Sequence, residues 1–177
     1  HTPESVLKFV KDNEIESIWH WFVDLEGQIK GFSITPSELE RSLEDGMHFD
    51  GSSISGFNAI EESDLVAKPD LSTFVELPDF GDNPRSVAYY CNIETPDGKP
   101  YDRDSRAILR RVTEQAKEMG YDTFMGPELE FFIFASSQYP ELLDSGGYFT
   151  GPPVDRGGPI RNDIIKALQA LGITVEY

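Results

Sequence analysis

The chain has 177 residues, and its 15 Lys and Arg stand against 32 Asp and Glu, which gives a formal net charge of −17. A surface this acidic repels phosphate backbones and anionic lipid, so nucleic acids and membranes are excluded as expected partners. The chain is 38% hydrophobic and 12% aromatic, which is typical of a globular protein with a sizeable core in one domain or two small ones.

The single cysteine excludes a disulfide framework and a cysteine-based zinc cluster. Cys91 lies in the apolar run "SVAYYCNIE", which predicts a core position. No uninterrupted apolar segment is long enough to span a bilayer and no signal-peptide pattern opens the chain, so a cytoplasmic location is expected. The chain starts at His1 rather than at Met and stops after the strand-like "ITVEY", which indicates a fragment.

The N-terminal half predicts a small α+β unit. Pro3 behind Thr2 is typical of a helix start, and "TPSELERSL" repeats that pattern further along. Between them, "SIWHWFVDLEGQIKGFSI" alternates around a turn at Glu26 and Gly27, which predicts a β-hairpin. Short strands are expected at residues 65–68, 73–76 and 86–93. We therefore predict a domain over residues 1–94.

The turn-rich stretch "TPDGKPYDRD" is the predicted domain boundary. After it, Asp104 is expected to cap a helix that presents Ile108 and Val112 on one face. A strand "TFMGPELEFFIF", a long Gly/Ser/Pro loop, a helix from Pro159 and a last strand "ITVEY" follow. Residues 95–177 thus form a second α+β domain.

Glu128 and Glu130 lie two residues apart in a predicted strand, so their side chains share one face. Two adjacent carboxylates beside phenylalanines are costly to bury unless a cation compensates, and Mg²⁺ or Mn²⁺ prefers carboxylate oxygens. The alternative is an edge strand whose glutamates face water.

Asp50 lies in "MHFDGSSISGF", a polar stretch between apolar residues. An ordinary Asp turn explains this pattern, and a functional loop anchored by Phe49 and Ile54 explains it as well. The sequence contains no G-x-S-x-G elbow, no phosphate-binding P-loop and no G-x-G-x-x-G turn. His20, among aromatic residues in "WHWF", is expected to be a residue of the strand surface or of the core.

Six segments in order resemble glutamine synthetase, type I: "FVDLEGQIKGFSI", "FDGSSISGFNAIEESDL", "PDGKP", "GPELEFFIF", "GGYFTGPPVD" and "LGITVEY". The resemblance covers nearly the whole chain. It implies a β-grasp domain over residues 1–94 and an incomplete ATP- and metal-binding catalytic domain over residues 95–177. It also implies ATP-dependent formation of glutamine from glutamate and ammonia through γ-glutamyl phosphate.

The resemblance implies roles for six residues. Glu128 and Glu130 match ligands of two divalent metal ions, Mg²⁺ or Mn²⁺, and Glu176 matches a glutamate at the ATP site. Asp50 matches the aspartate that binds ammonium and takes its proton. Ser53 lies beside it in the motif, and Tyr148 matches the tyrosine of the ammonium pocket.

The resemblance further implies a homo-oligomer of two stacked six-subunit rings, in which the Asp50 loop completes the active site of a neighbouring subunit. Two departures are visible. Leu129 replaces a frequent proline, and Asn58 with Ala59 replaces an arginine tied to feedback in some relatives. Most of the nucleotide and glutamate site lies beyond Tyr177, so the chain alone is expected to bind metal weakly and to be inactive.

Three alternatives remain at this point. The protein could be a γ-glutamyl ligase for another amine, which Asp50 and Ser53 argue against. It could be a short non-catalytic relative that binds or regulates full-length rings. An unrelated metal-dependent hydrolase would leave Asp50 and Tyr148 without a role.

Overall fold

The computed structural model describes residues 1–54, 56, 64–78 and 84–176. The chain divides into two compact units, His1–Thr123 and Phe124–Tyr177, and each is described by itself. The predicted α+β class is confirmed. Asn58 and Ala59, which stand where some relatives have an arginine, lie outside the described residues.

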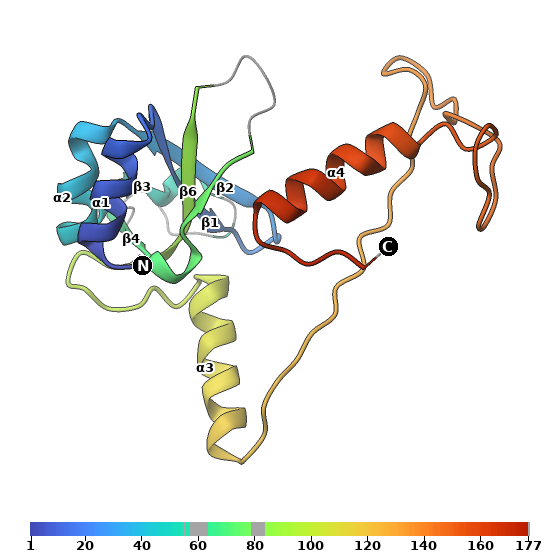
Figure 1. The fold of residues 1–177 in the computed structure, drawn as a ribbon. Coiled ribbons are helices and arrows are strands. Elements are labelled where there is room, and N and C mark those ends of the chain that lie inside the picture. Colours follow the sequence, from blue (N-terminus) through green and yellow to red (C-terminus); the bar gives the residue numbers. More distant parts are fainter. Residues whose placement is uncertain (55, 57–63, 79–83, 177) are drawn as a thin grey trace. The chain divides into compact units, whose positions relative to one another are not determined.

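One mixed sheet organises the first unit (Figure 1). Among the described residues it runs in the order β2-β1-β6-β4-β3, and β5 also pairs with β6. β1 and β6 are parallel, whereas the other pairs are antiparallel. The strands are β1 (Ser17–Val23), β2 (Ile29–Ile34), β3 (Met47–Asp50), β4 (Asp64–Pro69), β5 (Val75–Glu76) and β6 (Ser86–Glu94).

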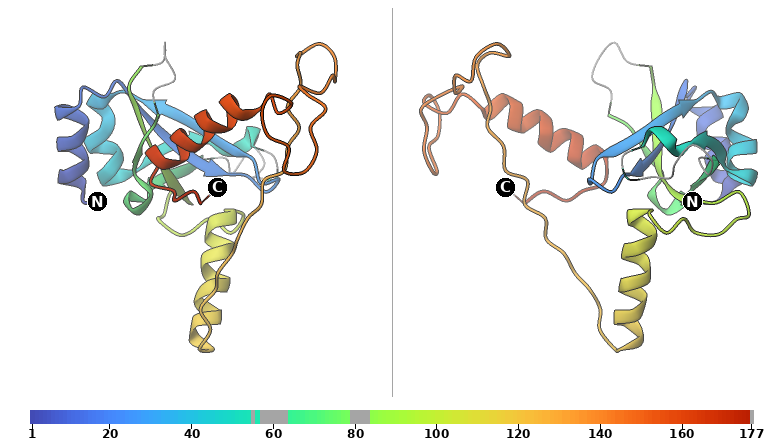
Figure 2. Two further views of the ribbon diagram at one scale, coloured as in Figure 1. Left: turned by 45° about the vertical axis from the view of Figure 1, so that its right-hand side comes forward. Right: turned by 180° about the vertical axis from the view of Figure 1, so that it is seen from behind.

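Two helices lie side by side against this sheet, as both Figure 1 and Figure 2 show. α1 (Pro3–Asp12) is capped by Thr2, whose side chain accepts a hydrogen bond from the Ser5 amide, and it buries Val6 and Val10. α2 (Leu39–Asp45) follows the short 3₁₀ helix η1 (Pro36–Glu38). Alternate residues of β1 face the same interior, which gives the unit a continuous apolar core.

The turn between β1 and β2 is fixed by Asp24, a buried carboxylate. Its Oδ1 accepts hydrogen bonds from the Glu26 and Gln28 amides, both at 2.9 Å. Gly27 adopts a φ of 80°, a left-handed conformation that glycine tolerates best. Burial tends to raise the pKa of Asp24, but these amides and the Lys30 ammonium outweigh it and lower that pKa.

α3 (Ser105–Glu118) belongs to the first compact unit and is tied to β6 through its N-terminus. Buried Asp104 caps the helix by accepting from the Arg106 amide at 3.1 Å, and it accepts from the Ile93 amide at 3.2 Å. The Arg106 guanidinium pairs with Asp70 at 2.6 Å and lies over the Tyr90 ring. The predicted cap at Asp104 is confirmed.

The second unit contains one long element in its described part, α4 (Gly158–Ala170), which confirms the helix predicted from Pro159. The strand predicted over residues 123–134 is wrong: the segment is irregular and exposed, and its one ladder contact is an isolated bridge between Phe134 and Leu142. Residues 173–176 also form no strand. A strand requires a continuous row of backbone hydrogen bonds to a partner, and in the described residues the segment 123–134 has such contacts only at its end, where the Leu143 amide donates to the Ile133 carbonyl beside the Phe134–Leu142 bridge.

Two strands of the first unit differ from the sequence prediction. Residues 73–76 were expected to be one strand, but they divide into the 3₁₀ helix η4 (Leu71–Thr73) and the two-residue strand β5. Asp70 caps η4 through its carboxylate. The stretch before Asp50, for which the sequence predicted no element, forms β3 and pairs with β4.

Candidate functional site

Asp50 is the last residue of β3, at the edge of the sheet, and its side chain is exposed. Its Oδ1 accepts a hydrogen bond from the Ser52 amide at 2.8 Å and caps the 3₁₀ helix η2 (Gly51–Ser53). The Ile54 amide then donates to the Gly51 carbonyl at 3.0 Å. The carboxylate is therefore held at a defined place at the entrance of a tight turn.

Apolar residues on both sides of this turn hold it against the core, as the sequence suggested. The Phe49 ring lies 5.1 Å from the Phe22 ring, between ring centres, and both Phe49 and Ile54 pack against the core cluster. Ser53 lies in η2, but its side chain is outside what the structure describes.

Glu128, Glu130 and Glu176 all belong to the second unit and are exposed in irregular segments. Their carboxylate oxygens are the donors that hard divalent cations prefer, so the chemistry of the first two fits Mg²⁺ or Mn²⁺. Within the described ranges, however, no three His, Cys, Asp or Glu side chains gather into a metal-binding group. The structure thus supplies carboxylates of the right type without assembling them.

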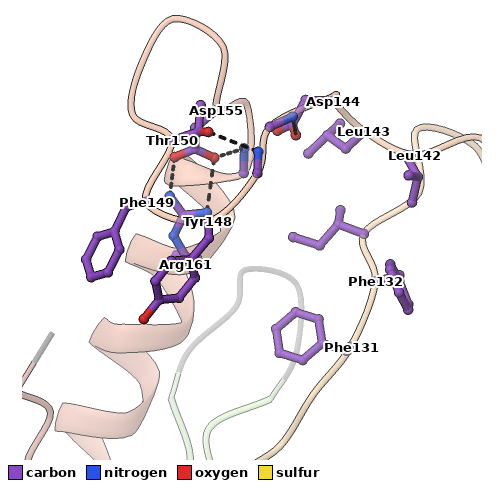
Figure 3. A pocket seen from close by; sticks show the side chains of 14 residues that line it. Phe131, Phe132, Leu142, Leu143, Asp144, Tyr148, Phe149, Thr150, Asp155 and Arg161 are labelled. Atoms are coloured by element: carbon purple, nitrogen blue, oxygen red, sulfur yellow. Dashed lines mark hydrogen bonds and ion pairs between the residues drawn. The ribbon is translucent and has the colours of Figure 1, made fainter.

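Tyr148 lines a pocket of about 830 Å³ within the second unit (Figure 3). Figure 3 shows Tyr148, Phe149 and Arg161 on one side of it and Phe131 and Phe132 on the other. The Tyr148 ring makes an edge contact with Phe149, 4.5 Å between centres, and the tyrosine is 95% exposed. Its phenol is therefore available to a ligand.

Hydrogen bonds shape the loop that carries Tyr148. The Gly147 amide donates to Thr150 Oγ1 at 2.9 Å, and Asp144 accepts from the Gly146 and Arg156 amides at 2.9 and 2.8 Å. These two amides keep the pKa of Asp144 below its ordinary value.

At the start of α4, Arg161 pairs with Asp155 through both carboxylate oxygens. Hydrogen bonding from Arg161 lowers the pKa of Asp155, so the pair remains charged. No sequence motif singles out Asp144, Asp155 or Arg161. The Gly/Pro-rich composition of the loop marked this region as of interest. It could not indicate which carboxylate binds which amide or guanidinium.

The six predicted residues divide between the two units. Asp50 and Ser53 belong to the first, whereas Glu128, Glu130, Tyr148 and Glu176 belong to the second. Of these six residues only Tyr148 is among those that line the pocket, and the three glutamates are not among its lining residues. The roles of all six residues stay predictions.

Comparisons with known proteins define the class. The family model described as "Glutamine synthetase, beta-Grasp domain" matches residues 14–96, and "Glutamine synthetase, catalytic domain" matches residues 102–177. The glutamine synthetase of Thermotoga maritima is 44% identical over 179 residues, which cover 99% of this chain and 41% of that protein. That of Mycolicibacterium smegmatis is 41% identical over 98% of this chain and 40% of its own length.

A cryo-EM structure of Plasmodium falciparum glutamine synthetase shares the fold, with a TM-score of 0.77 and 22% identity over 100% of this chain and 41% of that chain. The chain belongs to the glutamine synthetase family. It spans about two fifths of the length of the curated relatives that it matches. In the described residues, no helix is long and apolar enough to cross a membrane.

Proposed function

We propose that this chain is part of a glutamine synthetase, which forms glutamine from glutamate and ammonia at the expense of ATP. The observation that carries the proposal is the joint match of the β-grasp and catalytic family models, in the family's order, over most of the chain. The partners proposed with it are glutamate, ammonium, ATP and further copies of the same chain, in two stacked six-subunit rings in the cytoplasm.

In this proposal Asp50 binds ammonium and takes a proton from it. Ammonium has no lone pair, so it must lose a proton before its nitrogen can attack a carbonyl carbon. An exposed carboxylate whose backbone is fixed by the η2 turn is suited to this task. The nitrogen then attacks γ-glutamyl phosphate, a C–N bond forms, phosphate leaves with the C–O bonding electrons, and the new amide nitrogen releases its extra proton to solvent.

Tyr148 and Ser53 complete the ammonium site in the proposal. An exposed phenol can accept a hydrogen bond from the cation, and the adjacent aromatic ring of Phe149 offers a π face to positive charge. A hydroxyl at Ser53 adds a further acceptor. Since the Asp50 loop completes a neighbouring subunit's site in this proposal, assembly is a condition of activity.

Glu128 and Glu130 would hold Mg²⁺ or Mn²⁺, and Glu176 would lie at the nucleotide. A bound divalent cation would neutralise charge between the glutamate carboxylate and the triphosphate. This chain offers few ligands for each ion, so we expect weak metal binding and no activity from residues 1–177 alone.

ATP-dependent glutamine formation tests the proposal, measured on residues 1–177 and on a protein that continues to the length of the relatives. We expect activity only in the longer protein. Asp50→Ala should lower kcat by about a hundredfold or more, the usual effect of losing a positioned base. Asp64→Ala provides the control, because Asp64 is exposed and directly opposite Asp50 in the β3–β4 pair.

Absence of activity in the longer protein, or an unaffected Asp50→Ala variant, would contradict the catalytic assignment. A longer protein that binds and inhibits active rings without making glutamine would instead indicate a regulatory relative.

A further inference from the structure

The far end of the Asp50 turn is held by an arginine that comes from a distant part of the chain. Arg103 Nη1 donates a hydrogen bond to the Gly56 carbonyl at 3.2 Å, across 47 residues of sequence. Gly56 follows the η2 turn that Asp50 caps. Arg103 thus connects the segment before α3 to the loop that carries the proposed base.

The backbone that presents Arg103 is itself firmly fixed. Tyr101 is buried, and its amide donates to the Ile93 carbonyl of β6 at 2.9 Å. Asp104 is fully buried, its amide donates to the Tyr101 carbonyl, and its carboxylate accepts from the Ile93 amide. Because both residues that flank this turn are anchored to β6, the guanidinium is attached to a rigid support.

A second turn contacts Gly56 from another direction. A Cβ atom placed on Gly56 would lie 2.7 Å from Leu25 Cδ1 and 3.2 Å from Leu25 Cβ, so the backbone at Gly56 packs directly on that side chain. Leu25 follows Asp24, whose carboxylate fixes the β1–β2 turn. The φ of 78° at Gly56 also favours glycine.

We propose that Arg103 is a positioning residue for Asp50, and that it sets the geometry of the ammonium site by fixing the end of the loop on which Asp50 lies. The inference rests on the proposed function. Phe49 and Ile54 anchor the turn by apolar contacts, which tolerate sliding, whereas a hydrogen bond from a charged donor restricts direction as well as distance. In this proposal Arg103 acts through the loop, by its hydrogen bond to the Gly56 carbonyl.

The test uses the full-length protein with Arg103→Ala, Arg103→Lys and a matched control, Arg111→Ala. Arg111 is exposed on α3, and among the described residues it makes no hydrogen bond to the loop. We expect Arg103→Ala to raise KM for ammonium by about tenfold, with the KM values for glutamate and ATP unchanged. Arg103→Lys should recover most of the loss, because an ammonium group can also donate to the Gly56 carbonyl.

Hydrogen–deuterium exchange provides a readout that does not depend on activity. In Arg103→Ala the peptide that contains residues 50–54 should exchange faster, with peptides from β1 and β6 unchanged, and Arg111→Ala should match the wild type. Gly56→Ala should produce the same local effect, because the added methyl group meets Leu25.

The outcomes separate the two proposals. If the wild type makes glutamine and Asp50→Ala does not, an unchanged KM for ammonium in Arg103→Ala overturns the positioning role. Equal changes for all three substrates also overturn it, because they indicate a general structural effect. If the wild type makes no glutamine, the proposed function fails, and unchanged exchange in residues 50–54 refutes the role of Arg103 independently.

Discussion

His20 lies in the core of the first unit, where its Nε2 is 2.6 Å from Ser42 Oγ and 2.9 Å from Tyr89 Oη. The imidazole stacks on Phe32 and has no exposed surface. A serine beside a histidine is the geometry of an activated nucleophile, but a substrate cannot reach a fully buried pair. Of the two predicted places for His20, the strand surface and the core, the structure shows the core.

Burial lowers the pKa of His20 to about 4, from an ordinary value of 6.5. Between these values the unfolded chain binds a proton that the folded chain does not bind, so stability falls as the pH drops from about 6.5 towards 4. The lowered pKa corresponds to roughly 3 kcal/mol of unfolding free energy across that window.

Denaturant unfolding at several pH values between 4 and 7 measures this dependence. We expect His20→Gln to be less stable than the wild type at pH 7 but to lose less stability on acidification. His48→Gln is the control for the loss of a histidine at an exposed position. If the unfolding free energies of the wild type and His20→Gln depended equally on pH, His20 would not be a buried imidazole that stays neutral in the folded chain.

At the scale of elements, α3 belongs to one domain by sequence family and to the other by its contacts. The catalytic-domain model begins at residue 102, yet α3 groups with the β-grasp sheet in the first compact unit. The contacts responsible lie at its N-terminus: buried Tyr101, the Asp104 carboxylate on the Ile93 amide, and the Arg106–Asp70 pair. The exposed Leu109 and Val112 show that its remaining apolar face is not covered by this unit.

We therefore predict that residues 1–123 fold more stably than residues 1–96. The shorter chain loses the burial of Tyr101 and leaves the Ile93 amide without its acceptor, which together should cost about 3 kcal/mol or more of unfolding free energy. Denaturant titrations of both fragments measure the difference. Within 1–123, Asp104→Ala should reproduce much of the loss and Asp102→Ala, at an exposed position, should not. Equal midpoints and slopes for the two fragments would contradict the prediction.

Elements with their own local signals could be predicted from the sequence. Helix caps and tight turns depend on only a few neighbouring residues. The caps at Thr2 and Asp104 and the turn at Glu26 and Gly27 each lie where expected. The segment 123–134 has equally suitable β residues but no partner strand in the described residues. Strand formation depends on residues far away in sequence, which local patterns do not contain.

The same physical limit applies to the candidate site. Asp50 in a Gly/Ser turn and the exposed Tyr148 could be selected by motif, because their neighbours in sequence define them. Arg103 could not, because its partner is 47 residues away and nothing in "YDRD" indicates it. The roles of the carboxylates likewise came from the family resemblance, since two exposed glutamates are by themselves an ordinary surface feature.

At the scale of the whole molecule, the two units differ in how they treat apolar residues. The first buries a continuous core of aliphatic and aromatic side chains between the sheet and its helices. In the second, large apolar side chains stay exposed, and Phe132 is 77% accessible. Others in the same unit are Phe124, Met125, Leu129, Phe131, Phe149 and Ile173. Exposed apolar surface on this scale marks a surface that binds protein or a liability for association.

We predict that isolated residues 1–177 self-associate or unfold with low cooperativity, whereas residues 1–123 remain largely monomeric. Burying one large apolar side chain contributes about 1.5–3 kcal/mol, so a few such contacts give micromolar association even against the repulsion of a net charge of −17. Light scattering during size-exclusion chromatography over a range of concentrations measures this.

Phe124→Ser combined with Phe132→Ser should reduce the associated fraction. Raising the salt concentration should increase it, because screening weakens the charge repulsion but not the apolar contacts. A monodisperse monomer of 1–177 with one cooperative unfolding transition would show instead that the second unit protects its apolar surface unaided.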